Sequence, residues 1–321
     1  MLLTRREIMS VLAPQSALTA VRDGFVAMAG ADATFGTRFP VPLPPPAGPS
    51  SSAMLLAPGY VPGIPAYSVK MHAKFPGNDP ALQGLILLHD LESGNLLAVL
   101  ESTWLTALRT GVSGALGADC LARPDATVAA IIGAGAQGRT QLECLRWVRD
   151  LTAVRVFDTD PARAEAFAAE QARATGLPVT VCDSVAGALN GADIVVAVTW
   201  ATEPFITAGM VAPGMHISTL GPDQPGKAEV SAEVIRSSWF VVDDRDLAVA
   251  MGAAGGVGLG AETIDTTLAE VLAGQVPGRT GAEQCTVYGA VGLPFQDLVV
   301  AWAAYRAAQA RGLGRTVRFL D

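Results

Sequence analysis

The stretch Ala129–Gly138 most constrains how this chain can fold, because an apolar run leads directly into the pattern G-x-G-x-x-G. Each glycine has a separate task in such a turn. Gly133 allows the tight turn, Gly135 lets a pyrophosphate approach the backbone, and Gly138 lets a helix pack closely on the strand. A helix beginning here presents free N–H groups and partial positive charge to the phosphates. The pattern therefore predicts a dinucleotide-binding turn.

The residues around the turn decide between this interpretation and an ordinary glycine-rich turn, since Gly is 34 of 321 residues. Residues 128–132 are typical of a buried strand, and residues 139–148 carry apolar side chains at helical spacing. Residues 154–157 then predict a second strand, which ends in Asp158. An acidic residue at this distance accepts hydrogen bonds from the adenosine ribose hydroxyls. Because Asp158 would repel a 2′-phosphate, the sequence favours NAD(H) over NADP(H).

Composition excludes several classes of protein. With 50% apolar residues, a net charge of −8 and no basic stretch, the chain favours a large core and not a nucleic-acid partner. No apolar run approaches the ~20 residues that a membrane span needs, and the first residues lack a signal-peptide pattern. The four cysteines, at positions 120, 144, 182 and 285, have no metal or redox spacing. We therefore expect reduced, buried thiols, no metal site and a cytoplasmic location.

The order of predicted elements indicates two domains in an α/β chain. From about residue 127 to 288, strands alternate with helices that begin near Pro161, Ser184 and Ser231. This alternation predicts a doubly wound, Rossmann-type parallel sheet. We assign residues 121–290 to this dinucleotide-binding domain. Residues 1–120 and 291–321 are assigned to a second domain of α+β type, which must hold the substrate.

The second domain is predicted to mix helices and strands. Residues 1–30 are expected to be helical, with Thr4 and Glu7 as a capping box. Strands are predicted at residues 67–70, 85–88 and 96–99, with a hairpin turn between the last two. The segment 40–52 is rich in Pro, Gly and Ser and is expected to be a surface loop. A final helix is predicted at 295–309, returning to this domain.

Three isolated cations in the second domain point to an anionic ligand. Arg38, Lys70 and Arg109 each lie among apolar residues, where a cation needs a partner of opposite charge. A structural ion pair or a snorkelling side chain would explain any one of them alone. Three together indicate a carboxylate-bearing substrate, with a cofactor phosphate as a second possibility for Arg109. His72, two residues from Lys70, is placed either in the same site or at the surface.

Asp223 is the candidate acid or base. It lies in the loop 220–229, which follows the predicted strand 216–219. This order places it at a carboxyl edge of the sheet, where doubly wound folds bind their ligands. A carboxylate there can face a nicotinamide and exchange a proton. A turn residue or a helix cap is the alternative interpretation of Asp223.

These elements occur in the order of the ornithine cyclodeaminase/μ-crystallin family, which the chain resembles over nearly its whole length. The segments that carry the resemblance are Lys70, Pro76-Gly77-Asn78, Leu82-Gln83, the turn 90–94, Leu105–Thr110, Gly133–Gly138, Gly221–Glu229 and Val291–Asp297. The resemblance implies NAD(H)-dependent hydride exchange at the α-carbon of an amino or imino acid. It also implies a homodimer that forms through the non-nucleotide domain.

The resemblance assigns roles to individual positions. It implies catalytic roles for Lys70 and Asp223. Arg38, Lys70 and Arg109 would hold the substrate carboxylate, with His72 lining the same site. The positions implied to contact the cofactor are Arg109, Thr110, Gly133, Gly135, Ala136, Gln137, Gly138, Asp158, Thr199, Leu220 and Lys227.

Departures from ornithine cyclodeaminase favour a dehydrogenase or imine reductase. Gly84 stands where that enzyme has a cofactor-contacting Thr, and Ala290 stands where it has a Ser. Redox-neutral cyclodeamination, which uses NAD and releases ammonia, stays open as an alternative. A non-catalytic small-ligand-binding protein is a third hypothesis, which the joint presence of Lys70, Arg109 and Asp223 opposes.

Overall fold

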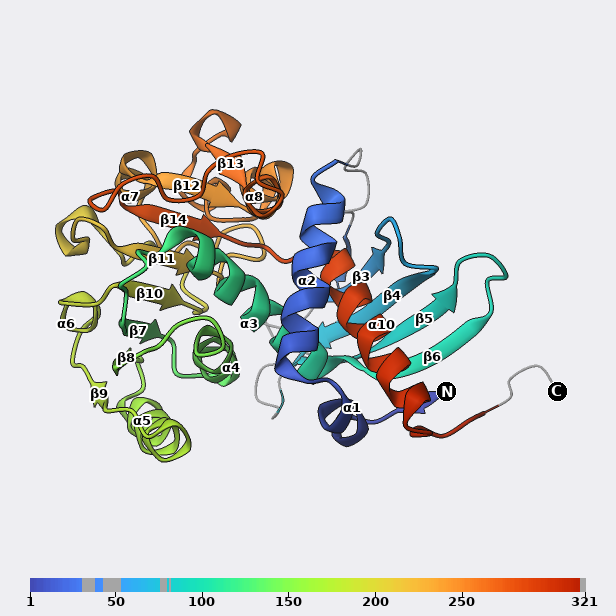
Figure 1. The fold of residues 1–321 in the computed structure, drawn as a ribbon. Coiled ribbons are helices and arrows are strands. Elements are labelled where there is room, and N and C mark those ends of the chain that lie inside the picture. The colour runs from blue at the N-terminus through green and yellow to red at the C-terminus, as the bar shows by residue number, and fades with distance from the viewer. Residues whose placement is uncertain (31–37, 43–52, 76–79, 81, 318–321) are drawn as a thin grey trace. The chain divides into compact units, whose positions relative to one another are not determined.

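The structure, a computed structural model, describes residues 1–30, 38–42, 53–75, 80 and 82–317. The chain forms two compact units (Figure 1). Unit 1 comprises Met1–Arg109 and Leu293–Asp321, and unit 2 comprises Thr110–Gly292. The first boundary falls inside helix α3 (Ser102–Leu121), and the second falls just before the last long helix. Each unit is described separately below.

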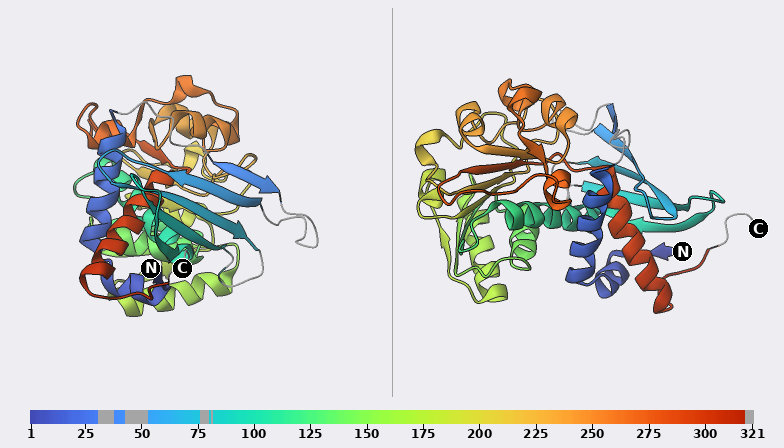
Figure 2. Two further views of the ribbon diagram at one scale, coloured as in Figure 1. Left: turned by 90° about the vertical axis from the view of Figure 1, so that its right-hand side faces the viewer. Right: turned by 45° about the horizontal axis from the view of Figure 1, so that its top comes forward.

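Unit 1 contains a six-stranded sheet with helices on one face. The strands lie in the order β1-β6-β5-β4-β3-β2, and every pair is antiparallel except β1 with β6. Helix α10 packs on β3, β4 and β5 and lies beside α2 (Figure 2). The elements are β1 (Leu2–Leu3), α1 (Arg5–Val11), α2 (Pro14–Met28), β2 (Phe39–Pro42), β3 (Ala53–Gly59), β4 (Ala66–Lys74), β5 (Leu82–Asp90), β6 (Leu96–Glu101) and α10 (Pro294–Ala310).

Most sequence-based predictions for unit 1 are confirmed. The Thr4–Glu7 capping box begins α1, and a short break before Pro14 separates α1 from α2. The hairpin turn after β5 forms around Asp90, whose side chain accepts hydrogen bonds from the backbone and the hydroxyl of Ser93. The predicted loop 40–52 is wrong at its start, because Phe39–Pro42 forms the edge strand β2, where proline is tolerated. Residues 43–52, like Pro76–Asn78, lie outside the described residues.

Unit 2 is the doubly wound parallel sheet that the alternation predicts. Its eight strands lie in the order β13-β12-β14-β11-β10-β7-β8-β9, and all pairs are parallel. The strands are β7 (Val128–Ile132), β8 (Ala153–Phe157), β9 (Val179–Val181), β10 (Ile194–Ala197), β11 (His216–Thr219), β12 (Trp239–Val242), β13 (Thr266–Thr267) and β14 (Thr286–Gly289). The α-helices besides α3 are α4 (Ala136–Leu145), α5 (Pro161–Thr175), α6 (Val185–Leu189), α7 (Ala232–Ser237), α8 (Arg245–Ala250) and α9 (Leu268–Leu272).

The strand order brings three carboxyl ends together. Strand β10 pairs with β7 on one side and with β11 on the other. The glycine-rich turn after β7, Thr199 after β10 and Leu220 after β11 therefore share one edge of the sheet. Strands β10, β11 and β14 are buried along their whole length, as a parallel sheet covered on both faces requires. The insertion of β14 between β11 and β12 was not predicted.

The four cysteines are less buried than the sequence predicts. Cys144 is buried, but Cys120, Cys182 and Cys285 are only half-buried, so the expectation of four buried thiols is wrong for three of them. All four are free.

Within the described part of the chain, no group of His, Cys, Asp and Glu side chains is arranged to hold a metal ion. No helix among those same residues combines the length and apolarity needed to cross a membrane.

Candidate active site

In unit 1, two predicted cations converge on one buried carboxylate. Lys70 on β4 donates from Nζ to Asp297 Oδ2 at 2.5 Å, and Arg109 on α3 donates from Nε to Asp297 Oδ1 at 3.2 Å. Arg109 Nη1 also donates to Gln296 Oε1 at 3.1 Å. Asp297 and Gln296 lie in the first turn of α10, and Asp297 is only 1% exposed. One carboxylate therefore holds two cations that come from distant parts of the chain.

Burial and mutual charge set the protonation of this cluster. Burial lowers the pKa of Lys70 to about 7; Asp297 opposes this shift, and the charges of Arg109 and Arg38 add to it. Burial alone would raise the pKa of Asp297, but Lys70 and Arg109 hold it below its ordinary value. The carboxyl is thus ionised at neutral pH, whereas the amine lies close to its titration point.

Arg38 and His72 belong to the same electrostatic environment. The charge of Arg38 depresses the pKa of Lys70, and His72 contributes to the lowered pKa of Asp297. His72 is buried, so the surface alternative for it is wrong. Sequence reasoning assigned no role to Asp297 or Gln296. The available signal was an acidic residue beginning an otherwise apolar helix.

In unit 2, the glycine-rich turn has the geometry that its sequence predicts. Gly133 has φ +104°, and a Cβ there would lie 2.7 Å from the carbonyl oxygen of Val198. A Cβ on Gly138 would lie 2.2 Å from the carbonyl oxygen of Gly133, so only glycine allows this packing. A Cβ on Gly135, by contrast, would meet no atom within 4 Å. The turn is closed on the protein side and leaves open space at the position where a phosphate would approach.

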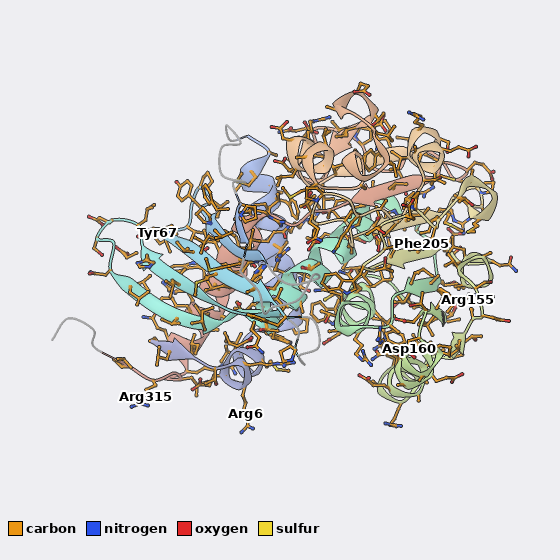
Figure 3. All side chains as sticks on the ribbon, turned by 180° about the vertical axis from the view of Figure 1, so that it is seen from behind. Arg6, Tyr67, Arg155, Asp160, Phe205 and Arg315 are labelled. Atoms are coloured by element: carbon orange, nitrogen blue, oxygen red, sulfur yellow. The ribbon has the colours of Figure 1, made fainter. Side chains whose placement is uncertain are left out.

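Three of the predicted cofactor contacts lie around this turn, two on helix α4 and one at the end of β8. Ala136 and Gln137 begin helix α4, and Gln137 Oε1 is buried without a hydrogen-bond partner among the described residues. Asp158, at the end of β8, accepts from the backbone N–H of Ala134 at 2.8 Å and of Asp160 at 2.9 Å. Its Oδ1 also lies 3.5 Å from Arg163 Nη1. Asp160, labelled in Figure 3, caps helix α5 as the sequence predicts.

The Asp223 loop contains an ion pair. Lys227 Nζ lies 2.8 Å from Asp223 Oδ1, donates to the carbonyl oxygen of Gly221 at 3.2 Å, and lies 4.3 Å from the centre of the Trp200 ring. Lys227 is buried, whereas the Trp200 side chain is 64% exposed at the same edge. Trp200 was not predicted as a site residue. The signal available in the sequence was a tryptophan directly after Thr199, a predicted cofactor contact.

A second buried carboxylate, Glu229, holds this edge together. Its Oε1 accepts from the N–H of Thr199 at 2.6 Å and from the Thr199 hydroxyl at 2.8 Å. Its Oε2 accepts from the Thr219 hydroxyl at 2.7 Å and from the N–H of Gly221 at 3.1 Å. Burial raises the pKa of Glu229, and these hydrogen bonds oppose the rise only in part. Sequence reasoning did not single out Glu229.

The two remaining predicted cofactor contacts take part in the backbone framework of unit 2. The carbonyl oxygen of Thr110, on α3, accepts from Gln141 Nε2 at 3.0 Å. Leu220 is buried, and its N–H donates to the carbonyl oxygen of Ala197 at 3.0 Å. Leu220 thus extends the register of β11 with β10 beyond the strand ends.

Curated relatives match more than three quarters of the chain. An alanine dehydrogenase from Archaeoglobus fulgidus is 30% identical, over 99% of this chain and 98% of its own. The mouse ketimine reductase mu-crystallin is 33% identical, over 77% of this chain and 80% of its own.

Solved structures match equally well. An archaeal alanine dehydrogenase dimer with bound NAD superposes with a TM-score of 0.91 at 29% identity, covering 100% of this chain and 99% of its own. The Thermococcus litoralis Delta(1)-pyrroline-2-carboxylate reductase, in complex with NADH and L-proline, gives 0.92 at 29% identity, covering 99% and 100%. A lysine cyclodeaminase, solved to explain recognition of L-lysine, L-ornithine and L-2,4-diaminobutyric acid, gives 0.85 at 26% identity, covering 98% and 94%. The sequence pattern of the ornithine cyclodeaminase/mu-crystallin family matches residues 1–312, and the chain belongs to this family.

Proposed function

We propose that this chain is an NAD(H)-dependent oxidoreductase that exchanges a hydride with the α-carbon of a small α-amino acid or the matching imine. The observation that carries the proposal is the buried cation cluster around Asp297. Lys70 and Arg109 are two buried cations that pair with the single carboxylate of Asp297. An uncompensated buried cation is costly, so a substrate carboxylate is the counter-ion that the cluster fits. The relatives that share this architecture act on amino acids or imines.

The residues of unit 1 would bind and orient the substrate. Lys70, Arg38 and Arg109 hold its carboxylate, and His72 lines the same site. The placement of Arg109 beside Lys70 supports a carboxylate contact rather than a cofactor phosphate. With a pKa near 7, Lys70 can also hold or release a proton at Nζ during turnover.

The residues of unit 2 would bind the dinucleotide. The turn Gly133–Gly138 cradles the pyrophosphate, Asp158 accepts from the ribose hydroxyls, and Thr199 and Lys227 lie at the edge that the nicotinamide half would occupy. The open space at Gly135 and the buried Gln137 Oε1 support this fit. When bound, the nicotinamide supplies or accepts the hydride. The carboxylate of Asp158 supports NAD(H) over NADP(H).

Asp223 is the group that we assign to proton exchange with the substrate nitrogen. It lies in the loop after β11, and Lys227 holds its carboxylate at 2.8 Å. A positioned acid or base of this kind contributes about 10²–10⁴-fold to the rate. Asp223→Asn is therefore expected to lower kcat by about that factor while NADH still binds. Asp183→Asn, at an exposed carboxylate elsewhere in unit 2, is the matched control and should leave kcat unchanged.

The activity test is a screen of 2-oxo acids with ammonia or methylamine, and of cyclic imines, following NADH and NADPH oxidation in parallel. We expect NADH oxidation with at least one member of this panel. The lysine cyclodeaminase neighbour supports cyclodeamination as the second candidate. That reaction would release ammonia from ornithine or lysine without a net change in NADH. Unchanged turnover in Asp223→Asn and Lys70→Ala would contradict the catalytic assignment and favour a ligand-binding role.

We also propose that the chain forms a homodimer through the open face of the unit 1 sheet. Cross-strand pairs place Phe39, Leu56, Met71 and Leu85 in one row across β2, β3, β4 and β5. Phe39, Met71 and Leu85 are 51%, 45% and 43% exposed. A contiguous apolar face of this kind is typical of a protein interface, and the archaeal relative is a dimer.

The dimer is tested by light scattering of Leu85→Glu. We expect this variant to be monomeric, because a charge at the β5 end of the apolar row opposes the burial of that row in an interface. Met9→Glu, at a similarly exposed apolar residue on α1, is the control that should stay dimeric. A wild-type monomer, or a dimer that survives Leu85→Glu, would overturn the proposal. The cytoplasmic location stays a prediction from the sequence.

A further inference from the structure

Glu229 links two neighbouring strand ends through separate oxygens. Oε1 accepts hydrogen bonds from the N–H and the hydroxyl of Thr199, just after β10. Oε2 accepts hydrogen bonds from the hydroxyl of Thr219 and the N–H of Gly221, at the end of β11. The side chain thereby fixes the start of the loop that carries Asp223 and Lys227. A single carboxylate sets the distance between two segments that we assign to cofactor binding.

These four hydrogen bonds to the Glu229 carboxylate, here called the Glu229 clamp, leave the side chain little freedom to move. A Cβ on Gly221 would lie 2.3 Å from Glu229 Oε1, so the loop approaches the carboxylate more closely than any other residue would allow. The main chain of Glu229 is also held, because its carbonyl oxygen accepts from the N–H groups of Phe205 and Ile206. The carboxylate cannot shift without moving the strand ends or the loop.

The clamp is costly to fold, which argues against a purely structural purpose. Each described hydrogen-bond donor to the Glu229 carboxylate is neutral, and burial raises its pKa, so its ionised form is disfavoured. The amino edge of the same sheet has a different arrangement. There Asp193 accepts from the N–H groups of Thr127 and Val128 but also pairs with Arg123 at 2.5 Å. Costly buried groups are concentrated at functional sites.

We propose that Glu229 is a positioning residue that holds Thr199 and the Gly221–Lys227 loop in the arrangement that binds the nicotinamide dinucleotide. This inference rests on the proposed function. It adds a residue that acts on cofactor affinity through others, without touching the cofactor. It also predicts that cofactor affinity and global stability respond separately to changes in unit 2.

The experiment compares Glu229→Gln with Asp193→Asn in the full chain. Gln keeps the shape but turns one acceptor into a donor that faces other donors, so one half of the clamp is lost. NADH titrations are expected to show a Kd about tenfold higher or more in Glu229→Gln. Amide hydrogen exchange should accelerate at Thr199 and Gly221. Asp193→Asn, which breaks a carboxylate clamp at the opposite edge, should lower Tm yet leave the NADH Kd within about twofold.

A folded Glu229→Gln with the wild-type NADH Kd would overturn the proposal, and so would an equal loss of affinity in Asp193→Asn. If Glu229→Gln does not fold, Thr219→Val removes one neutral donor and keeps the carboxylate. That variant should raise the NADH Kd by about threefold, and an unchanged Kd would equally overturn the inference. Failure of the wild-type chain to bind NADH would instead contradict the proposed function.

Discussion

Asp297 in unit 1 and Glu229 in unit 2 are equally buried carboxylates with opposite electrostatics. Each is 1% exposed. Lys70 and Arg109 hold the pKa of Asp297 below its ordinary value despite burial, whereas Glu229 has only neutral donors to oppose burial and its pKa rises. Burial alone therefore does not determine how such a group behaves. Asp297 holds two cations in place, where they can bind an anionic ligand. Glu229 accepts hydrogen bonds from neutral groups and fixes the positions of the segments that carry them.

The largest effect is expected from Asp297→Asn. Removing this charge leaves Lys70 and Arg109 buried against each other, and breaking a buried pair costs about 3–5 kcal/mol of unfolding free energy. We expect kcat/KM for the imino or amino acid to fall about 10²-fold or more, because the two cations lose their common anchor. Steady-state kinetics and urea unfolding measure the two effects. If Asp297→Asn folds and keeps the wild-type kcat/KM, Asp297 does not organise the substrate-binding cations and its contrast with Glu229 fails.

A pH profile separates the charge cluster from the rest of the molecule. Because the pKa of Lys70 is about 7, the ammonium is lost as pH rises through that value, and carboxylate binding weakens. We expect kcat/KM to fall about tenfold between pH 6 and pH 8. Lys70→Arg keeps a cation at all pH values, so its kcat/KM should not fall between pH 6 and pH 8, whatever the absolute rate of the variant. If kcat/KM of Lys70→Arg falls over the same range, the titrating group is not Lys70.

Stability should respond to pH in opposite directions at the two carboxylates. The lowered pKa of Asp297 contributes stability that is present above the ordinary carboxyl value and is lost as pH falls through the lowered pKa. The raised pKa of Glu229 contributes stability that is fully present below its ordinary value and is lost as pH rises through the raised pKa.

Urea unfolding of Glu229→Gln and Asp297→Asn from mildly acidic to mildly basic pH measures this difference. The deficit of Glu229→Gln should shrink with rising pH, by about 1.4 kcal/mol for each unit of pKa shift. Because Asp297 also raises the pKa of Lys70, Asp297→Asn is measured in a Lys70→Met background, where its deficit should stay constant. Parallel pH profiles for the two variants would refute the contrast.

Asp158 is intermediate between Asp297 and Glu229. It accepts hydrogen bonds from two backbone N–H groups, which are neutral, and it also lies near the cation of Arg163. Asp158→Asn is expected to raise the NADH Kd about fivefold and to narrow the preference over NADPH. Asp160→Asn, at the neighbouring helix cap, is the control that should leave this preference unchanged. Titrations with both dinucleotides give the result, and an unaltered preference in Asp158→Asn would remove the assigned role.

Local sequence signals anticipated the elements that carry strong periodicity or punctuation. The strand before Gly133, the hairpin at Asp90 and the caps at Asp160, Ser184 and Ser231 all depend on nearby residues, so the sequence alone predicts them. The edge strand containing Pro40 was missed because proline usually marks a loop, and only pairing with β3 makes it a strand. The place of β14 in the sheet likewise depends on long-range pairing.

The candidate site divides in the same way. Residues in sequence motifs, such as Lys70, Arg109 and Asp223, were identified from their types and surroundings. Their partners were not, because Asp297 is 227 positions from Lys70, and Glu229 reaches Thr199 across 30 positions. An acidic residue near the start of an apolar helix was visible in the sequence, but its role depends on partners that only the fold brings near. The roles of Asp297 and Glu229 were therefore not predictable from the sequence alone.

The most direct test of this account measures NADH Kd and substrate kcat/KM, at saturating NADH, in Asp297→Asn and Glu229→Gln side by side. Asp297→Asn should lose substrate kcat/KM while its NADH Kd stays within about twofold of the wild-type value. Glu229→Gln should show the reverse, with weaker NADH binding as its main defect. If both variants lose both properties equally, the two carboxylates share one structural role and the account is contradicted.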